Sequence, residues 1–157
     1  MFANTVMTFK EQLMTDIKTA MKAGNHEELT TLRGLSSVIK NTEIAKQMKQ
    51  GASATITDEE IMNVLLTEAK KRKDAIAAFM TGGRPELAEA EQKELLVVGR
   101  YLPKQMSAEE TAAAVETIIA AAGAKDFPGA MKAVMAELRG KADTGAIAEQ
   151  IKKKFGK

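Results

Sequence analysis

The sequence contains no cysteine and no tryptophan, a single histidine, and only three prolines in 157 residues. The absence of cysteine excludes disulfides, thiolate metal sites and every mechanism that needs a cysteine nucleophile, including that of the cysteine-dependent glutamine amidohydrolases. Aromatic residues make up only 4% of the chain, so aliphatic side chains and methionine must fill the core. Alanine, leucine and methionine are strong helix formers, and the composition therefore favours a helical protein.

Long apolar segments are also absent. No apolar run reaches the roughly 18 residues of a membrane-spanning helix, and the opening residues MFANTVMTFK lack the apolar segment of a secretory signal. We therefore expect a cytoplasmic protein without a membrane partner. The formal net charge is +2, and this overall charge alone does not indicate a nucleic-acid-binding protein.

Helix start signals recur along the chain. Three Ser/Thr-x-x-Glu pairs predict capping boxes, and apolar residues follow each pair at helical spacing. These pairs are Thr8 with Glu11, Thr57 with Glu60, and Ser107 with Glu110. Pro85 suits the first turn of a further helix, because the hydrogen-bond donor that proline lacks is unpaired at that position.

The order of these signals predicts the architecture. Four longer helices precede the segment from Tyr101 to Met106, three shorter helices follow it, and no segment alternates as a strand would. We expect an all-α protein with a four-helix bundle over residues 1–102, followed by a small three-helix bundle over residues 103–157.

Three segments match a known pattern in order and spacing. They are LTTLRGLSSVIKNTEIA (residues 29–45), KKRKDAIAAFMTGGRPELAEAEQKELLVVGRYLPKQMS (residues 70–107) and RGKADTGAIAEQI (residues 139–151). Together they resemble the YqeY family, which is similar to the tail domain of GatB. GatB is a subunit of the amidotransferase that converts misacylated Glu-tRNA or Asp-tRNA to the Gln or Asn form.

This resemblance implies a four-helix bundle joined to a three-helix bundle. It also implies tRNA, amidotransferase subunits or an aminoacyl-tRNA synthetase as partners. A carbon–nitrogen ligase activity with glutamine as amide donor is implied by the resemblance alone.

No self-contained active site is visible in the sequence. Amidotransfer needs a nucleophile with a base, and activation of the acceptor needs a phosphate cradle with a metal site. The TGGR segment (residues 81–84) lacks the following Lys-Ser/Thr and the preceding strand of a P-loop, so we interpret it as a turn. His26 has no cysteine or carboxylate at ligand spacing. We predict no catalytic residue, no metal ligand and no cofactor.

Positive side chains near the end of the chain are the main candidates for binding. If they converge, they form a surface for phosphates, and each neutralised phosphate releases counterions. The candidates are Arg139, Lys141, Lys152, Lys153 and Lys154, with Gly140 and Asp143 shaping the turn before the last helix, and Arg33, Arg72 and Arg84 form a second group.

Two functional hypotheses follow. In the first, the protein is a stand-alone version of the GatB tail that binds tRNA or a tRNA-handling enzyme. In the second, it is a protein–protein interaction module with no RNA contact and no catalysis. An enzyme with an unrecognised site is a third and weaker hypothesis.

Overall fold

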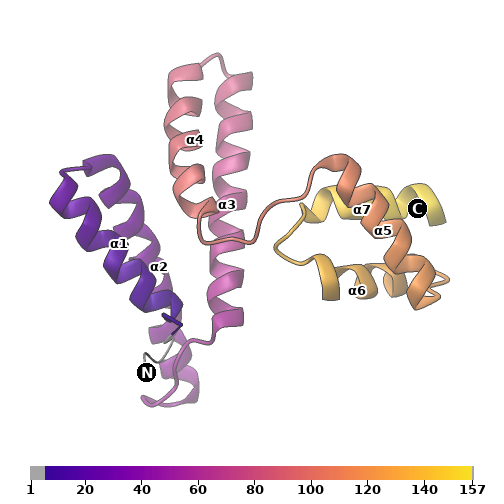
Figure 1. Cartoon of the computed structure of the whole chain (residues 1–157), viewed down its shortest axis with the longest axis horizontal. Helices are drawn as coiled ribbons and strands as arrows, with labels where there is room; N and C mark the ends of the chain where they lie inside the picture. The colour runs from indigo at the N-terminus through magenta and orange to yellow at the C-terminus, as the bar shows by residue number, and fades with distance from the viewer. Residues whose placement is uncertain (1–5, 157) are drawn as a thin grey trace, which may run out of the picture. The chain divides into compact units, whose positions relative to one another are not determined.

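A computed structural model describes residues 6–156 of the chain (Figure 1). Within that range the chain is helical, with no strand beyond an isolated bridge between Arg139 and Ala142. The helices are α1 (Phe9–Ala23), α2 (His26–Gln50), α3 (Asp58–Thr81), α4 (Pro85–Gly99), α5 (Ala108–Ala122), α6 (Phe127–Leu138) and α7 (Thr144–Phe155). The all-α prediction is confirmed. The chain divides into two compact units, the first ending at Tyr101 and the second beginning at Leu102.

The three predicted capping boxes are present. The hydroxyl groups of Thr8, Thr57 and Ser107 each accept a hydrogen bond from the backbone N–H three residues later, and the glutamate at that position accepts from the backbone N–H of the cap. Two orphan donors at each helix start are thereby satisfied. Pro85 is the first residue of α4, as predicted.

The first unit consists of two helical hairpins. Helices α1 and α2 pack together, α3 and α4 pack together, and α2 also contacts α3 and α4 (Figure 1). The most deeply buried large side chains are Leu32 and Leu35 of α2, Leu65 of α3 and Val98 of α4. The sequence predicted four helices here, and the structure arranges them as hairpins that meet through α2.

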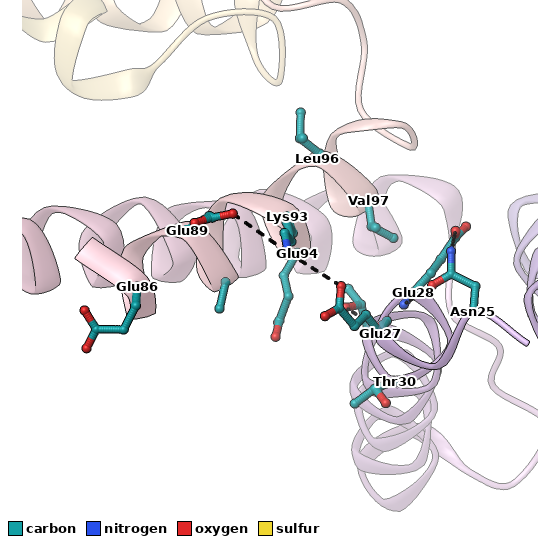
Figure 2. A pocket seen from close by; sticks show the side chains of 12 residues that line it. Asn25, Glu27, Glu28, Thr30, Glu86, Glu89, Lys93, Glu94, Leu96 and Val97 are labelled. Atoms are coloured by element: carbon teal, nitrogen blue, oxygen red, sulfur yellow. Dashed lines mark hydrogen bonds and ion pairs between the residues drawn. The ribbon is translucent and has the colours of Figure 1, made fainter. Parts of the chain in front are cut away.

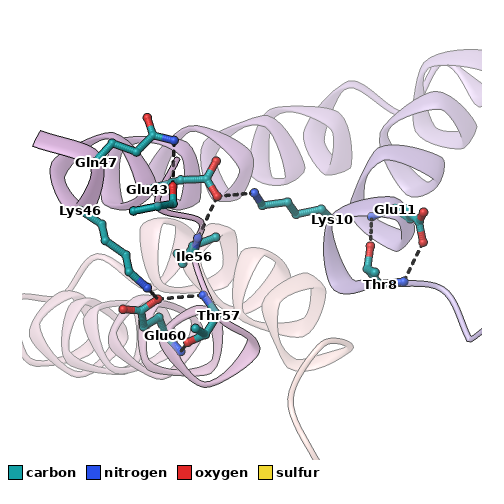
Figure 3. A network of polar contacts seen from close by, with 10 residues as sticks. Thr8, Lys10, Glu11, Glu43, Lys46, Gln47, Ile56, Thr57 and Glu60 are labelled. Atoms are coloured by element: carbon teal, nitrogen blue, oxygen red, sulfur yellow. Dashed lines mark hydrogen bonds and ion pairs between the residues drawn. The ribbon is translucent and has the colours of Figure 1, made fainter. Parts of the chain in front are cut away.

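A carboxylate near the end of α2 joins three segments of the first unit. Glu43 accepts hydrogen bonds from Lys10 Nζ of α1 at 2.5 Å and from the backbone N–H of Ile56 at 2.9 Å (Figure 3). One turn further on, Lys46 donates to Glu60 at 2.8 Å. The hydrogen bonds from Ile56 and Lys10 lower the pKa of Glu43 below its ordinary value.

The last residue of the first unit is held against α1. The hydroxyl of Tyr101 donates to the carboxylate of Asp16, and the Tyr101 ring meets the ring of Phe9 edge-on with centroids 5.2 Å apart. Burial and the hydrogen bond to Asp16 raise the pKa of Tyr101 well above its ordinary value. These contacts with Asp16 and Phe9 therefore fix Tyr101, the last residue of the first unit, against α1.

The second unit is a small three-helix cluster in which α5, α6 and α7 all contact one another. Its largest fully buried side chains are Val115, Val134, Ile147 and Ile151. None of the helices in the described range is long and apolar enough to cross a membrane.

The depressed pKa of Glu43 predicts a pH dependence of stability. A carboxylate whose pKa is lower in the folded than in the unfolded state stabilises the fold above the unfolded pKa, and this stabilisation is lost as the pH falls through the folded pKa. We expect the free energy of unfolding of the wild-type chain to fall more between pH 6 and pH 3.5 than that of Glu43→Gln, as measured by urea denaturation. Glu137→Gln, at an exposed carboxylate of α6, is the control and should follow the wild type. Parallel pH profiles for Glu43→Gln and the wild type would contradict the expectation.

The burial of Ile151 in the core of the second unit predicts that its truncation causes a large loss of stability. Ile151 is fully buried, so Ile151→Ala removes buried methyl and methylene groups and leaves a cavity at a cost of about 2–5 kcal/mol. Hydrogen exchange should show α5, α6 and α7 exchanging faster. Ala148→Gly, which changes a half-buried helix position, should cost only about 1 kcal/mol. A loss below 1 kcal/mol for Ile151→Ala would show that α7 is not packed as described.

Candidate polyanion-binding surface

The last helix presents its lysines to solvent because its apolar residues are buried. Asp143 caps α7 by accepting from the backbone N–H of Ala146 at 3.1 Å. Ile147 and Ile151 follow one helical turn apart, and each has 0% of its surface exposed. Their burial fixes the rotation of α7 about its axis.

Lys152, Lys153 and Lys154 occupy the last turn of α7. The side chains of all three are exposed, and within residues 6–156 none of these ammonium groups makes a hydrogen bond or ion pair. Successive helical residues are rotated by about 100°, so the three ammonium groups spread over about 200° of the helix surface. Positive charge in the last turn is favoured by the partial negative charge at a helix C-terminus.

A small cavity lies between α5 and α7 beside two of these lysines. It has a volume of about 280 Å³ and is lined by Val115, Glu116, Ile119, Gln150, Lys153 and Lys154. The carboxylate of Glu116 reduces the positive potential on that side of the helix. The structure therefore offers a set of exposed cations around a helix end rather than a closed anion pocket.

The turn before α7 carries the other two candidate cations. Gly140 has φ of 80°, which favours glycine, and its carbonyl accepts from Gln105 Nε2 at 2.7 Å. The carbonyl of Lys141 accepts from the backbone N–H of Met106 at 2.8 Å. These bonds tie the turn to the segment that precedes α5.

The structure does not bring all five candidate cations together. Arg139 and Lys141 precede α7, whereas the three lysines lie in its last turn. A helix of 12 residues is about 18 Å long, so the two groups lie at opposite ends of α7. Arg139 also has an interaction within the molecule.

The second group of candidate arginines lies in the first unit, where two of them are paired. Arg72 is largely buried and contacts Glu94 at 2.9 Å, and Arg84 contacts Glu86 at 2.6 Å. Arg33 is exposed, and its guanidinium lies 3.8 Å from the sulfur of Met21. Arg72 therefore has a structural role in joining α3 to α4, because its charge is already matched by a carboxylate.

Among residues 6–156, no group of three or more His, Cys, Asp or Glu side chains is placed to hold a metal ion.

A groove in the first unit lies between the start of α2 and one side of α4, and the sequence did not predict it. Residues 86, 89, 93 and 97 recur on α4 at spacings of three and four, which places them on one face. That periodicity was available in the sequence, but the packing of α2 against that face of α4 was not.

Comparison with known proteins places the chain in a family. A profile described as Yqey-like protein matches residues 10–155. "Altered inheritance of mitochondria protein 41, mitochondrial" of Kluyveromyces lactis is 30% identical over 162 positions, which cover 91% of this chain and 82% of that protein. The proteins of the same name from Clavispora lusitaniae and Lachancea thermotolerans are 39% and 38% identical over 90 residues, or 57% of this chain. These matches cover 49% and 46% of the two relatives, so the matched part spans about half of their length.

The names of these relatives correct one expectation from the sequence. We expected a cytoplasmic protein, but the relatives are named as mitochondrial proteins, which contradicts that expectation. The physical reason is that the absence of a long apolar segment argues only against secretion and membrane insertion, and does not distinguish the cytoplasm from mitochondria.

The profile match extends over nearly the whole chain, and the match to the Kluyveromyces lactis protein covers most of both sequences. These matches agree with the three segments that resemble YqeY proteins. The chain therefore belongs to the YqeY-like protein family.

Proposed function

We propose that this protein binds folded RNA, with tRNA as the first candidate, through contacts between phosphates and the lysines at the end of α7. The observation that carries the proposal is the presence of three consecutive exposed lysines without an ion-pair partner in the described structure. A cation without a carboxylate partner can contact a phosphate without first breaking an existing ion pair.

The spread of the lysines determines the mode of binding. Because Lys152, Lys153 and Lys154 point in different directions around α7, each is expected to contact a different phosphate. Such contacts give salt-dependent affinity without reading the base sequence. The chain has no tryptophan and few other aromatic residues, so recognition of RNA shape and backbone fits better than stacking on unpaired bases.

The resemblance to the GatB tail supports tRNA as the RNA. In this proposal the protein acts as a binding module for tRNA and an associated amidotransferase subunit or aminoacyl-tRNA synthetase, and the chemistry belongs to that partner. A second candidate function, a protein–protein interaction module, is favoured by the groove of the first unit.

The proposal predicts a steep salt dependence of tRNA binding. Affinity for a total tRNA pool, measured by filter binding between 50 and 300 mM salt, should fall linearly on a log–log plot. The triple variant Lys152→Ala, Lys153→Ala, Lys154→Ala should reduce the slope by about two to three, since each phosphate contact contributes about one.

A matched variant separates this effect from the loss of net charge. Lys18, Lys22 and Lys49 are also exposed but belong to the first unit, and changing all three to Ala should leave the slope close to that of the wild type. If the two triple variants change the slope equally, or if the wild type does not bind tRNA, the lysines of α7 do not form the proposed site.

A further inference from the structure

The first unit contains a groove that differs in charge from the end of α7. It has a volume of about 600 Å³, and its surface is more apolar than polar. Residues of α4 and of the start of α2 line it (Figure 2), including Thr31, Ala90 and Val97. Leu96 also lines the groove and has 73% of its surface exposed.

Carboxylates surround the apolar part of this groove. The charged lining residues are Glu27, Glu28, Glu86, Glu89, Lys93 and Glu94. Three of these glutamates are paired with arginines that do not line the groove, namely Glu28 with Arg100, Glu86 with Arg84 and Glu94 with Arg72. The other two glutamates, Glu27 and Glu89, have no arginine partner in the described part of the chain, and both lie near Lys93.

The lysine between Glu27 and Glu89 does not satisfy either carboxylate. Lys93 Nζ lies 3.9 Å from a carboxylate oxygen of Glu27 and 3.9 Å from one of Glu89 (Figure 2). Both distances are too long for a hydrogen bond. All three side chains are more than half exposed, so the two carboxylates retain capacity for a further cation.

We propose that this groove is a docking site for a basic amphipathic segment of a partner protein. An aliphatic side chain of that segment packs against Val97, Ala90 and Leu96, while a neighbouring lysine or arginine contacts Glu27 and Glu89. The charge of the groove determines this choice, because its carboxylates repel a phosphate backbone and attract a positive segment. The groove thus serves a different class of partner from the lysines of α7.

A defined peptide tests the proposal on the intact chain. The probe is a fluorescent helical peptide of about 15 residues, built from leucine, alanine and lysine with the lysines on one face. A counterpart carries glutamate in place of lysine. Fluorescence anisotropy at low ionic strength should show saturable binding of the lysine peptide and no binding of the glutamate peptide.

Variants locate the binding. The double variant Glu27→Gln, Glu89→Gln should weaken binding of the lysine peptide about fivefold, as expected for the loss of two exposed ion pairs. Leu96→Ser should also weaken it, because the apolar contact is lost. Glu137→Gln, Glu149→Gln removes the same charge from exposed positions of the second unit, and it should bind as the wild type does.

Four outcomes would overturn the proposal. The first is no binding of the lysine peptide, and the second is equal weakening by the two double variants. The third is concentration-dependent self-association, seen by sedimentation, that Glu27→Gln, Glu89→Gln abolishes, since the occupant would then be a second copy of this chain. If spermidine displaces the peptide fully and Leu96→Ser has no effect, the groove binds charge alone and the amphipathic partner is also rejected.

Discussion

The burial of Ile147 and Ile151 is the constraint on which the candidate RNA-binding surface depends. These two side chains, each fully removed from solvent, contribute to the core of the second unit and fix the rotation of α7. With the helix held in this way, Lys152, Lys153 and Lys154 are directed around its solvent side. Core packing and the exposure of the cations therefore have the same cause, which is the four-residue spacing of isoleucine before a run of lysines.

The two units use charge differently. In the first unit, ionic contacts join consecutive elements. Glu43 of α2 contacts Lys10 of α1 and Ile56 in the segment before α3, and Arg72 joins α3 to α4. In the second unit, acidic residues such as Asp126 and Asp143 cap helices, while the lysines in the last turn of α7 have no ion-pair partner among the residues that the structure describes. We interpret the paired charges as contributions to the fold and the unpaired ones as capacity for binding.

Local signals in the sequence predicted much of the fold, and the structure shows why the rest was not accessible. The boxes at Thr8, Thr57 and Ser107 depend on residues three positions apart, so the sequence displays them directly. The bond from Tyr101 to Asp16 spans 85 positions, and no local pattern predicts it. Contacts between separate helices were equally inaccessible for the candidate site. Arg72 belongs to a basic run in the sequence, and only the packing of α4 shows that Glu94 neutralises it.

The most direct test of RNA binding by α7 is a titration of the ¹⁵N-labelled chain with tRNA, followed by amide chemical shifts. Binding by the lysines predicts that the largest changes fall at residues 150–156 and at the facing turn of α5 around Glu116. Amides lining the acidic groove, such as those of Glu27 and Glu89, should not change. Changes confined to α1–α4, or no changes at saturating tRNA, would contradict the assignment of the RNA-binding surface to the end of α7.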